Sequence, residues 1–319
     1  MNRMTENKIV IIHRKTRLDE LVVKYNTLDQ ARFYVEHLGA DFSDYQLEDR
    51  KYKEALATVE RKLSGLGLVQ PLERSYVPSF VFGPNDIVVV VGQDGLVANT
   101  LKYLDAQPVV AVNPDPSRWD GVLLPFKVED VEKITKDLFN HKRLFQEITL
   151  ARASLTDGQT MYAVNDLFIG PKTHTSARYI LDTGTSREVQ SSSGIVVSTG
   201  LGSTGWLKSI LAGARGVISA ARAYGLVGGG PEATAENESG FSWAADYLFF
   251  SVREPFPSRT TNAGLIMGRI ADEDSLTVTS LMAGGGVIFS DGIESDFLEF
   301  NSGQTATIKI ADKKGRLVV

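Results

Sequence analysis

The sequence predicts an α/β protein in which an N-terminal domain with a parallel sheet is followed by a second, β-rich domain. Three short β-branched runs, around Lys8–His13, Ile87–Val91 and Val109–Val112, lack polar alternation, as strands buried on both faces do. Segments with apolar residues at helical spacing lie between these runs. This alternation of strands and helices is typical of a parallel sheet with covering helices. The pattern changes near residue 140, so we expect domains over 1–141 and 142–319.

Four helices are predicted in the first domain. Apolar residues recur at helical spacing over 28–38 and 44–64, and Leu96–Leu104 and Val128–Phe139 follow the second and third strands. The connection after residue 64 carries Pro71 and is expected to be a loop.

Period-two stretches of Leu, Ile, Tyr, Thr and Val predict strands in the second domain, separated by turn signals such as Asp157-Gly158. One embedded helix is predicted near Ser203–Ala223, and the Gly-, Glu- and Asn-rich stretch 228–240 is expected to be a surface loop. The predicted strands cover 143–155, 160–169, 177–182, 246–252, 264–270, 275–281, 287–289 and 304–310.

The composition excludes several classes of function. The 319 residues carry a net charge of −5, which argues against a nucleic-acid-binding protein. The absence of Cys excludes disulfides, thiolate nucleophiles and Cys-ligated metals, and the four scattered His indicate no metal site. The N-terminal apolar run is too short for a signal peptide or a membrane span, so we expect a soluble, cytoplasmic protein without a membrane partner.

The segment Gly92-Gln93-Asp94-Gly95 directly follows the strand Ile87–Val91. A glycine turn at the carboxyl end of a parallel strand, leading into a helix, offers backbone N–H groups to phosphate. An acid there suits a general base, or a group that helps to hold Mg²⁺ through water. The alternative interpretation is a plain turn in which Asp94 caps the helix.

Three segments of the second domain carry groups suited to a nucleotide. Asn165 and Asp166 could hold a ribose or a base edge, although strand alternation predicts that they face opposite ways, and an Asx turn is the simpler alternative. The segment 198–209 is dense in Gly, Ser and Thr, so a flat ligand could approach its backbone; Ser203 or Thr204 could cap the following helix. Asp291-Gly292 fits a type I′ turn.

The order of these motifs resembles the NAD kinase family, and more closely its mitochondrial-type branch. Gly92-Gln93-Asp94-Gly95 resembles the family's GGDG signature, and Ala111–Phe126 resembles a segment in which an Asn-x-Asp-Pro turn precedes a Gly-containing strand. The stretch 165–170 resembles the Asn-Glu motif, and 192–206 resembles the branch's SSG…TGTGS…W stretch. Ser251–Pro255 and Ser290–Gly292 match later landmarks.

The resemblance implies an α/β domain and a β-sandwich-like domain of the NAD kinase/diacylglycerol kinase type, with the site in the cleft between them. It implies transfer of the γ-phosphoryl of ATP, with Mg²⁺, to the adenosine 2′-hydroxyl of NAD, giving NADP, in a homodimer or homotetramer. Asp94 would be the catalytic base. The cofactor-binding residues would be Gly92, Gln93, Gly95 and Asn113. The substrate-binding residues would be Asn165, Asp166, Thr199, Ser203, Thr204, Gly205, Trp206, Ser209 and Asp291.

The sequence departs from the family pattern in the donor loop. Gln93 stands where the family has glycine, and its Cβ disfavours a positive φ. Leu96 replaces a threonine, and Asp166 replaces a glutamate. Two alternatives therefore stay open: a related kinase for another nucleotide, a sugar or a lipid, and a non-catalytic protein that binds NAD or ATP.

Overall fold

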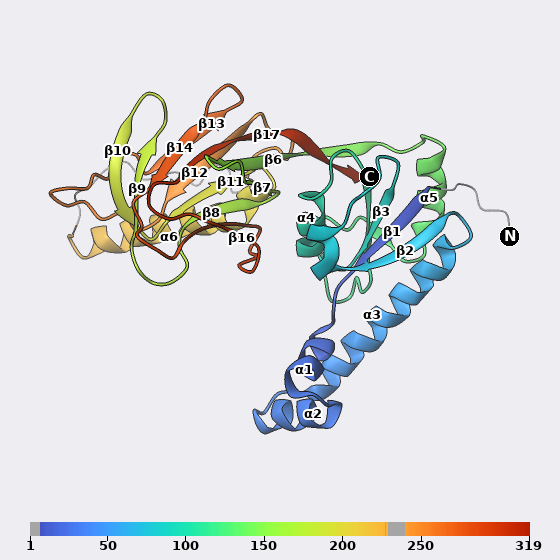
Figure 1. Cartoon of the computed structure of the whole chain (residues 1–319). Helices are drawn as coiled ribbons and strands as arrows, with labels where there is room; N and C mark the ends of the chain where they lie inside the picture. The colour runs from blue at the N-terminus through green and yellow to red at the C-terminus, as the bar shows by residue number, and fades with distance from the viewer. Residues whose placement is uncertain (1–6, 227, 229–239) are drawn as a thin grey trace. The chain divides into compact units, whose positions relative to one another are not determined.

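The computed structural model describes residues 7–226, 228 and 240–319. The chain forms two compact units (Figure 1). The first unit comprises Met1–Gln146 together with Arg316–Val319, and the second comprises Glu147–Gly315. The last four residues thus return to the first unit, at the end of the long strand β17 (Thr305–Val318).

The first unit is built on a parallel sheet in the order β4-β3-β1-β2, as the β-branched runs predict. Every residue of β3 is buried, which explains why its sequence shows no polar alternation. The strands are β1 (Lys8–His13), β2 (Leu68–Glu73), β3 (Ile87–Val91) and β4 (Pro108–Asn113), with β5 (Phe126–Lys127) and the end of β17 pairing with β4.

The expected loop around Pro71 is wrong, because this segment forms the edge strand β2. Proline has no N–H to donate to a ladder, and an edge strand needs a partner on one side only. Sequence patterning missed the strand because its residues are half-buried or exposed and no apolar run marks it.

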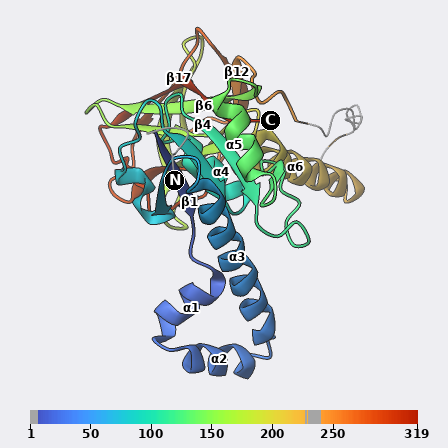
Figure 2. The same ribbon diagram turned by 90° about the vertical axis from the view of Figure 1, so that its right-hand side faces the viewer.

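The predicted helices are confirmed, and a further one precedes them. The long α3 begins against the small α1 and α2, whose apolar residues pack with Phe42 at its N-terminal end, and its last turns pack on the sheet through Val59 and Leu63 (Figures 1 and 2). The helices are α1 (Arg17–Tyr25), α2 (Leu28–His37), α3 (Phe42–Leu63), α4 (Asp94–Leu101) and α5 (Val131–Phe139).

The second unit contains two antiparallel layers, which confirms the β-sandwich-like prediction. One layer has the order β13-β12-β11-β8-β15-β16, and the other contains β10-β9-β14-β17, with β6 and β7 paired to each other. Residues of both layers, including Leu167 and Leu181, share one buried cluster, as facing sheets do. The strands not yet given are β6 (Phe145–Leu155), β7 (Thr160–Ala163), β8 (Asp166–Pro171), β9 (Ala177–Asp182), β10 (Arg187–Ser192), β11 (Ile195–Ser198), β12 (Tyr247–Val252), β13 (Met267–Ala271), β14 (Leu276–Ser280), β15 (Gly286–Ser290) and β16 (Phe297–Glu299).

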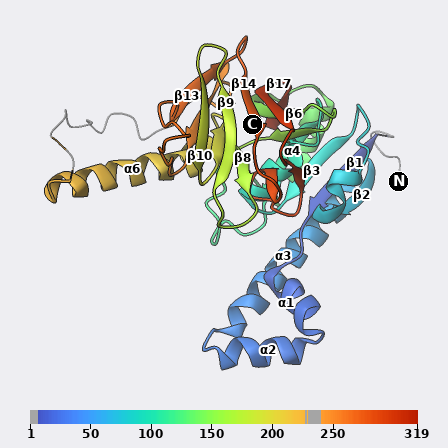
Figure 3. The ribbon, with the colours of Figure 1, turned by 60° about the vertical axis from the view of Figure 1, so that its left-hand side comes forward.

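The helix of the second unit, α6 (Trp206–Ala223), follows a single 3₁₀ turn. It extends away from the strands of its unit (Figure 3), and Leu207 is its one buried residue. The expectation that Ser203 or Thr204 caps this helix is wrong, because Gly205 occupies the N-cap position without a side-chain bond. The surface-loop prediction for 228–240 falls almost wholly outside the described residues.

None of the helices in the described part of the chain has the length and apolar character needed to cross a membrane.

Candidate functional site

The glycine turn lies where β3 ends and α4 begins, in the first unit. The buried Tyr52 hydroxyl, on α3, donates a hydrogen bond of 2.8 Å to the carbonyl of Val91, the last residue of β3. Gly92 lies beneath Leu96, whose Cδ2 would be 2.7 Å from any Cβ at position 92. The turn is therefore held by packing from α3 and α4.

Gln93 has φ −117°, an extended conformation that any residue adopts, and it forms the N-cap of α4 without a side-chain bond. The Cβ at position 93 therefore causes no backbone strain.

Asp94 is the first residue of α4 and is half-buried. Its Oδ1 accepts a hydrogen bond of 2.6 Å from the backbone N–H of Leu123. Its other oxygen has no hydrogen-bond partner within the described ranges. The alternative in which Asp94 is the helix cap is wrong, since Gln93 takes that position. One carboxylate oxygen is thus anchored while the other can accept a proton.

Asn113 is the last residue of β4 and is buried, and its amide bonds to the loop that follows. Its Oδ1 accepts from the N–H of Asp115 at 3.1 Å, and its Nδ2 donates to the carbonyl of Trp119 at 3.0 Å. These bonds shape the 113–119 turn. Asn113 thus supports its own loop in this structure. That Asn113 contacts a cofactor stays a prediction.

In the second unit, one pocket of about 340 Å³ brings together six of the predicted substrate-binding residues. They come from three segments: the turn before β8, the turn before α6 and the turn after β15. The lining residues are Asn165, Asp166, Leu201, Gly202, Thr204, Gly205, Trp206, Asp291 and Gly292. We refer to it as the small pocket.

Asp291 orders one wall of the small pocket. Its φ is +54° and that of Gly292 is +72°, in agreement with the predicted tight turn. Its Oδ1 accepts from the backbone N–H groups of Asn165 at 2.6 Å and Asp166 at 3.3 Å, and the carboxylate also accepts from Val164 at 3.0 Å. The bend so formed lets Asn165 and Asp166 both line the pocket, although alternation along a regular strand would separate them.

The pKa of Asp166 is raised to about 7, because burial penalises its charged form and the Asp291 carboxylate adds repulsion. A hydrogen bond from the Ser198 hydroxyl partly opposes this shift. Oδ1 of Asp166 is buried and has no partner. Near neutral pH this carboxyl can therefore either donate or accept a hydrogen bond inside the pocket.

Thr199 and Ser203 lie behind the small pocket and are buried. The Thr199 hydroxyl donates to the carbonyl of Val164 at 2.5 Å, and that of Ser203 donates to Gly200 at 2.7 Å. These hydroxyls fasten the turns that form the pocket. Ser209 is exposed on α6, bonds to the Gly205 carbonyl at 3.2 Å and does not line the pocket.

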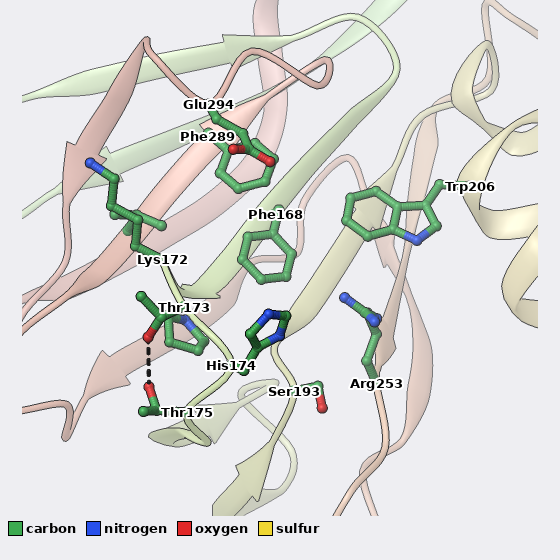
Figure 4. Close-up of a pocket in the computed structure, with 12 residues that line it drawn as sticks. Phe168, Lys172, Thr173, His174, Thr175, Ser193, Trp206, Arg253, Phe289 and Glu294 are labelled. Carbon is green, nitrogen blue, oxygen red and sulfur yellow. Dashed lines mark hydrogen bonds between the residues drawn. The ribbon is translucent and has the colours of Figure 1, made fainter. Parts of the chain in front are cut away.

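Trp206 also lines a second, larger pocket of about 460 Å³ on the same unit (Figure 4). Sequence reasoning singled out Trp206 but not the pocket, because its lining residues come from five separate segments. Its lining residues are Phe168, Pro171, Lys172, Thr173, His174, Thr175, Ser193, Trp206, Arg253, Val287, Phe289 and Glu294. We refer to it as the aromatic pocket.

Among the described residues, no three His, Asp or Glu side chains gather in a way that could hold a metal ion. The absence of Cys from the chain removes the remaining common ligand.

No model of a protein family matches the chain, and no curated protein matches it significantly in sequence. Solved structures do match its fold. A crystal structure of an NAD kinase from Archaeoglobus fulgidus in complex with ATP is 16% identical, with a TM-score of 0.54, over 97% of this chain and 92% of that one. Yeast NADH kinase complexed with NADH is 14% identical, with a TM-score of 0.55, over 99% and 84%. The resemblance that the ordered motifs suggested is thus confirmed at the level of architecture: the chain has the fold of the NAD kinases.

Proposed function

We propose that this protein is an ATP-dependent kinase that transfers the γ-phosphoryl of ATP to the 2′-hydroxyl of the adenosine ribose of NAD, giving NADP. The observation that carries the proposal is Asp94, a carboxylate with one anchored and one available oxygen at a glycine turn that begins a helix, in a chain with the fold of NAD kinases.

Asp94 would act as the general base. A ribose hydroxyl is a weak nucleophile, so its proton must leave as the bond to phosphorus forms. The hydrogen bond from Leu123 would fix the orientation of the carboxylate, while the second oxygen takes the proton. The N–H groups at the start of α4 suit the phosphates of ATP.

The small pocket would hold the adenosine of the acceptor. Asn165 offers an amide that can both donate to and accept from a base edge, and the Asp166 carboxyl can bond a ribose hydroxyl. Gly202 and Gly205 line this pocket beside them.

Mg²⁺ would enter with ATP and neutralise charge on its phosphates. The chain's own contribution is then positioning and proton acceptance.

The test is to incubate the purified protein with ATP, Mg²⁺ and NAD and to quantify NADP by chromatography. We expect NADP to form and Asp94→Asn to reduce the rate by at least about a hundredfold while the circular dichroism spectrum is unchanged. Asp120→Asn is the matched control, because Asp120 is exposed in the loop that contains Leu123.

NAD binding without NADP formation by the wild type would contradict the proposal and favour a non-catalytic binding protein. Release of ADP with a different acceptor would favour the related-kinase alternative.

We also propose that the chain works as a homo-oligomer, in which a second copy covers α6. Leu211, Val217 and Ile218 of this helix are exposed, whereas helices in proteins gain most of their stability from packing of an apolar face. Light scattering should give a mass above 34.9 kDa that the triple substitution of these residues by Ser lowers to the monomer value. A monomeric wild type would contradict this.

A further inference from the structure

The N–H group that anchors Asp94 belongs to a loop. Leu123, which donates this bond at 2.6 Å, lies in the connection 114–125 between β4 and β5. A hydrogen bond fixes its donor and its acceptor relative to each other. The orientation of the Asp94 carboxylate therefore depends on where this loop is held.

The loop is folded on itself. The carbonyl of Asp115 accepts from the N–H groups of Arg118 at 3.0 Å and Trp119 at 3.1 Å, and the carbonyl of Trp119 accepts from the Asn113 amide at 3.0 Å. Gly121 has a φ of +67°, and a Cβ there would lie 2.7 Å from Nδ2 of Asn113. We therefore expect the loop to move as a unit, so that a tie at Arg118 also places its far end.

One charged face of α3 provides such ties. Asp44, Glu48 and Lys51 follow one another at i, i+4 and i+7, so they lie along the same side of the helix. The Asp44 carboxylate accepts from both terminal nitrogens of Arg118, from Nη1 at 3.1 Å, and Lys51 donates to Asp115 at 3.0 Å. A two-point bond between a guanidinium and a carboxylate fixes direction as well as distance.

The same face of α3 is fastened to the segment that follows β1. Arg17 donates to Asp44 at 2.7 Å, and Arg14 donates at 3.0 Å to Glu48, which is buried. Hydrogen bonds from Arg118 and Arg17 hold the pKa of Asp44 well below its ordinary value, so this carboxylate is ionised at neutral pH. Arg118 thus binds an anion that a second guanidinium already holds in place.

We propose that Arg118 and Asp44 are positioning residues for Asp94: their ion pair places the loop so that the Leu123 N–H stays on one carboxylate oxygen and the other faces the acceptor hydroxyl. This inference rests on the proposed function, in which Asp94 is the general base. The side chains of Arg118 and Asp44 are 23% and 41% exposed, and partly exposed pairs add little to stability. Removing the pair should therefore slow the reaction without unfolding the protein.

Arg118→Met keeps the aliphatic stem and removes all five N–H donors. We expect kcat to fall about tenfold and KM for ATP and for NAD to stay within about twofold, because only the placement of the base changes. Arg118→Lys should give an intermediate kcat, since an ammonium keeps the charge but not the two-point bond. Asp44→Asn combined with Arg118→Met should lose no more rate than Arg118→Met alone, because both remove the same tie.

The control is Arg152→Met. Arg152 pairs with Asp312 at 3.2 Å in the second unit and its side chain is 30% exposed, so this variant loses a similar ion pair away from the loop. Its kcat should stay within about twofold of the wild type, as expected for a partly exposed pair.

Hydrogen–deuterium exchange at the Leu123 amide, read by mass spectrometry, follows the loop without any chemistry. Exchange should be about tenfold faster in Arg118→Met and unchanged in Arg152→Met. Wild-type kcat in Arg118→Met, a loss confined to KM, or a fall in kcat with unchanged exchange at Leu123 would overturn the inference. A wild type that forms no NADP contradicts the kinase proposal alone, and exchange at Leu123 then decides whether the pair places the loop.

Discussion

The carboxylate of Asp291 accepts the backbone N–H of Asn165 at 2.6 Å, which ties the turn after β15 to the turn before β8. The return bond runs from the N–H of Asp291 to the carbonyl of Asp166 at 3.0 Å. Two turns that are 125 residues apart in the sequence thus form one wall of the small pocket. Asp291 is needed for this wall whether or not it touches a ligand.

Asp291→Asn is expected to lower the free energy of unfolding by about 1–3 kcal/mol, because an amide offers one acceptor oxygen to several buried N–H groups. Equilibrium urea denaturation gives this value. Asp182→Asn is the control: that carboxylate accepts one N–H, from Gly184, in an exposed turn, and its loss should cost less than about 1 kcal/mol. Equal losses would show that Asp291 does not organise the wall.

Asp166 should make stability depend on pH. Its folded pKa, raised to about 7, lies above the unfolded value of about 4, so between these values the folded chain holds the extra proton. Stability therefore falls as pH rises through this window, and the full cost is present above about pH 7. Asp166→Asn removes the charge. The substitution should therefore leave the free energy of unfolding nearly unchanged at pH 4 and raise it by roughly 2–4 kcal/mol at pH 8.

Urea denaturation at pH 4, 6 and 8 measures this difference. Asp272→Asn, at an exposed position in the same unit, should show the same small effect at all three values. A stability difference for Asp166→Asn that does not grow with pH would mean that the carboxyl is ionised throughout.

Tyr52→Phe tests the support of the glycine turn. The hydroxyl accepts the N–H of Arg14 at 3.0 Å and donates to the carbonyl of Val91 at 2.8 Å, so its removal leaves buried backbone groups unpaired. We expect a loss of about 1–3 kcal/mol. Tyr162→Phe is the comparison, since that hydroxyl makes one exposed contact of 3.5 Å with Asp312 and should cost under about 0.5 kcal/mol. Similar losses would mean that the Tyr52 hydroxyl does not support β3.

The central strands were predictable because both faces of β3 and its neighbours are buried, which forces a continuous β-branched sequence. The edge strand β2 was not predictable, since a strand that pairs on one side only needs no continuous β-branched sequence and can contain Pro71. Helix α1 was missed although Leu18, Leu21, Val22 and Tyr25 recur at helical spacing and pack with α2 and the start of α3.

The small pocket was predictable because short motifs, rich in Gly, Ser and Asp, contribute its turns, and their order is retained along the chain. The role of each residue in that pocket was not predictable. Thr199 and Ser203 bond the backbone behind the pocket, and Asp291 bonds three N–H groups, partners that a local sequence cannot name. The aromatic pocket was not predicted as a whole, although Trp206 and the segments 192–206 and 251–255 were singled out, because pairing of β8 with β11 and β15 brings its residues together.

Two glycines of the second unit should respond in opposite directions to alanine. At Gly202, a Cβ would overlap the carbonyl oxygen of Asn165, so the two turns must separate; we expect a loss of about 1–3 kcal/mol in stability and weaker binding in the small pocket. At Gly213, exposed in the middle of α6, nothing lies within 4 Å of the new Cβ. Alanine there should raise helix propensity and stabilise by about 0.5–1 kcal/mol. The urea denaturation midpoints of both variants measure these two stability changes. Unchanged stability of Gly202→Ala would show that the contact with Asn165 is not close enough to fix the pocket.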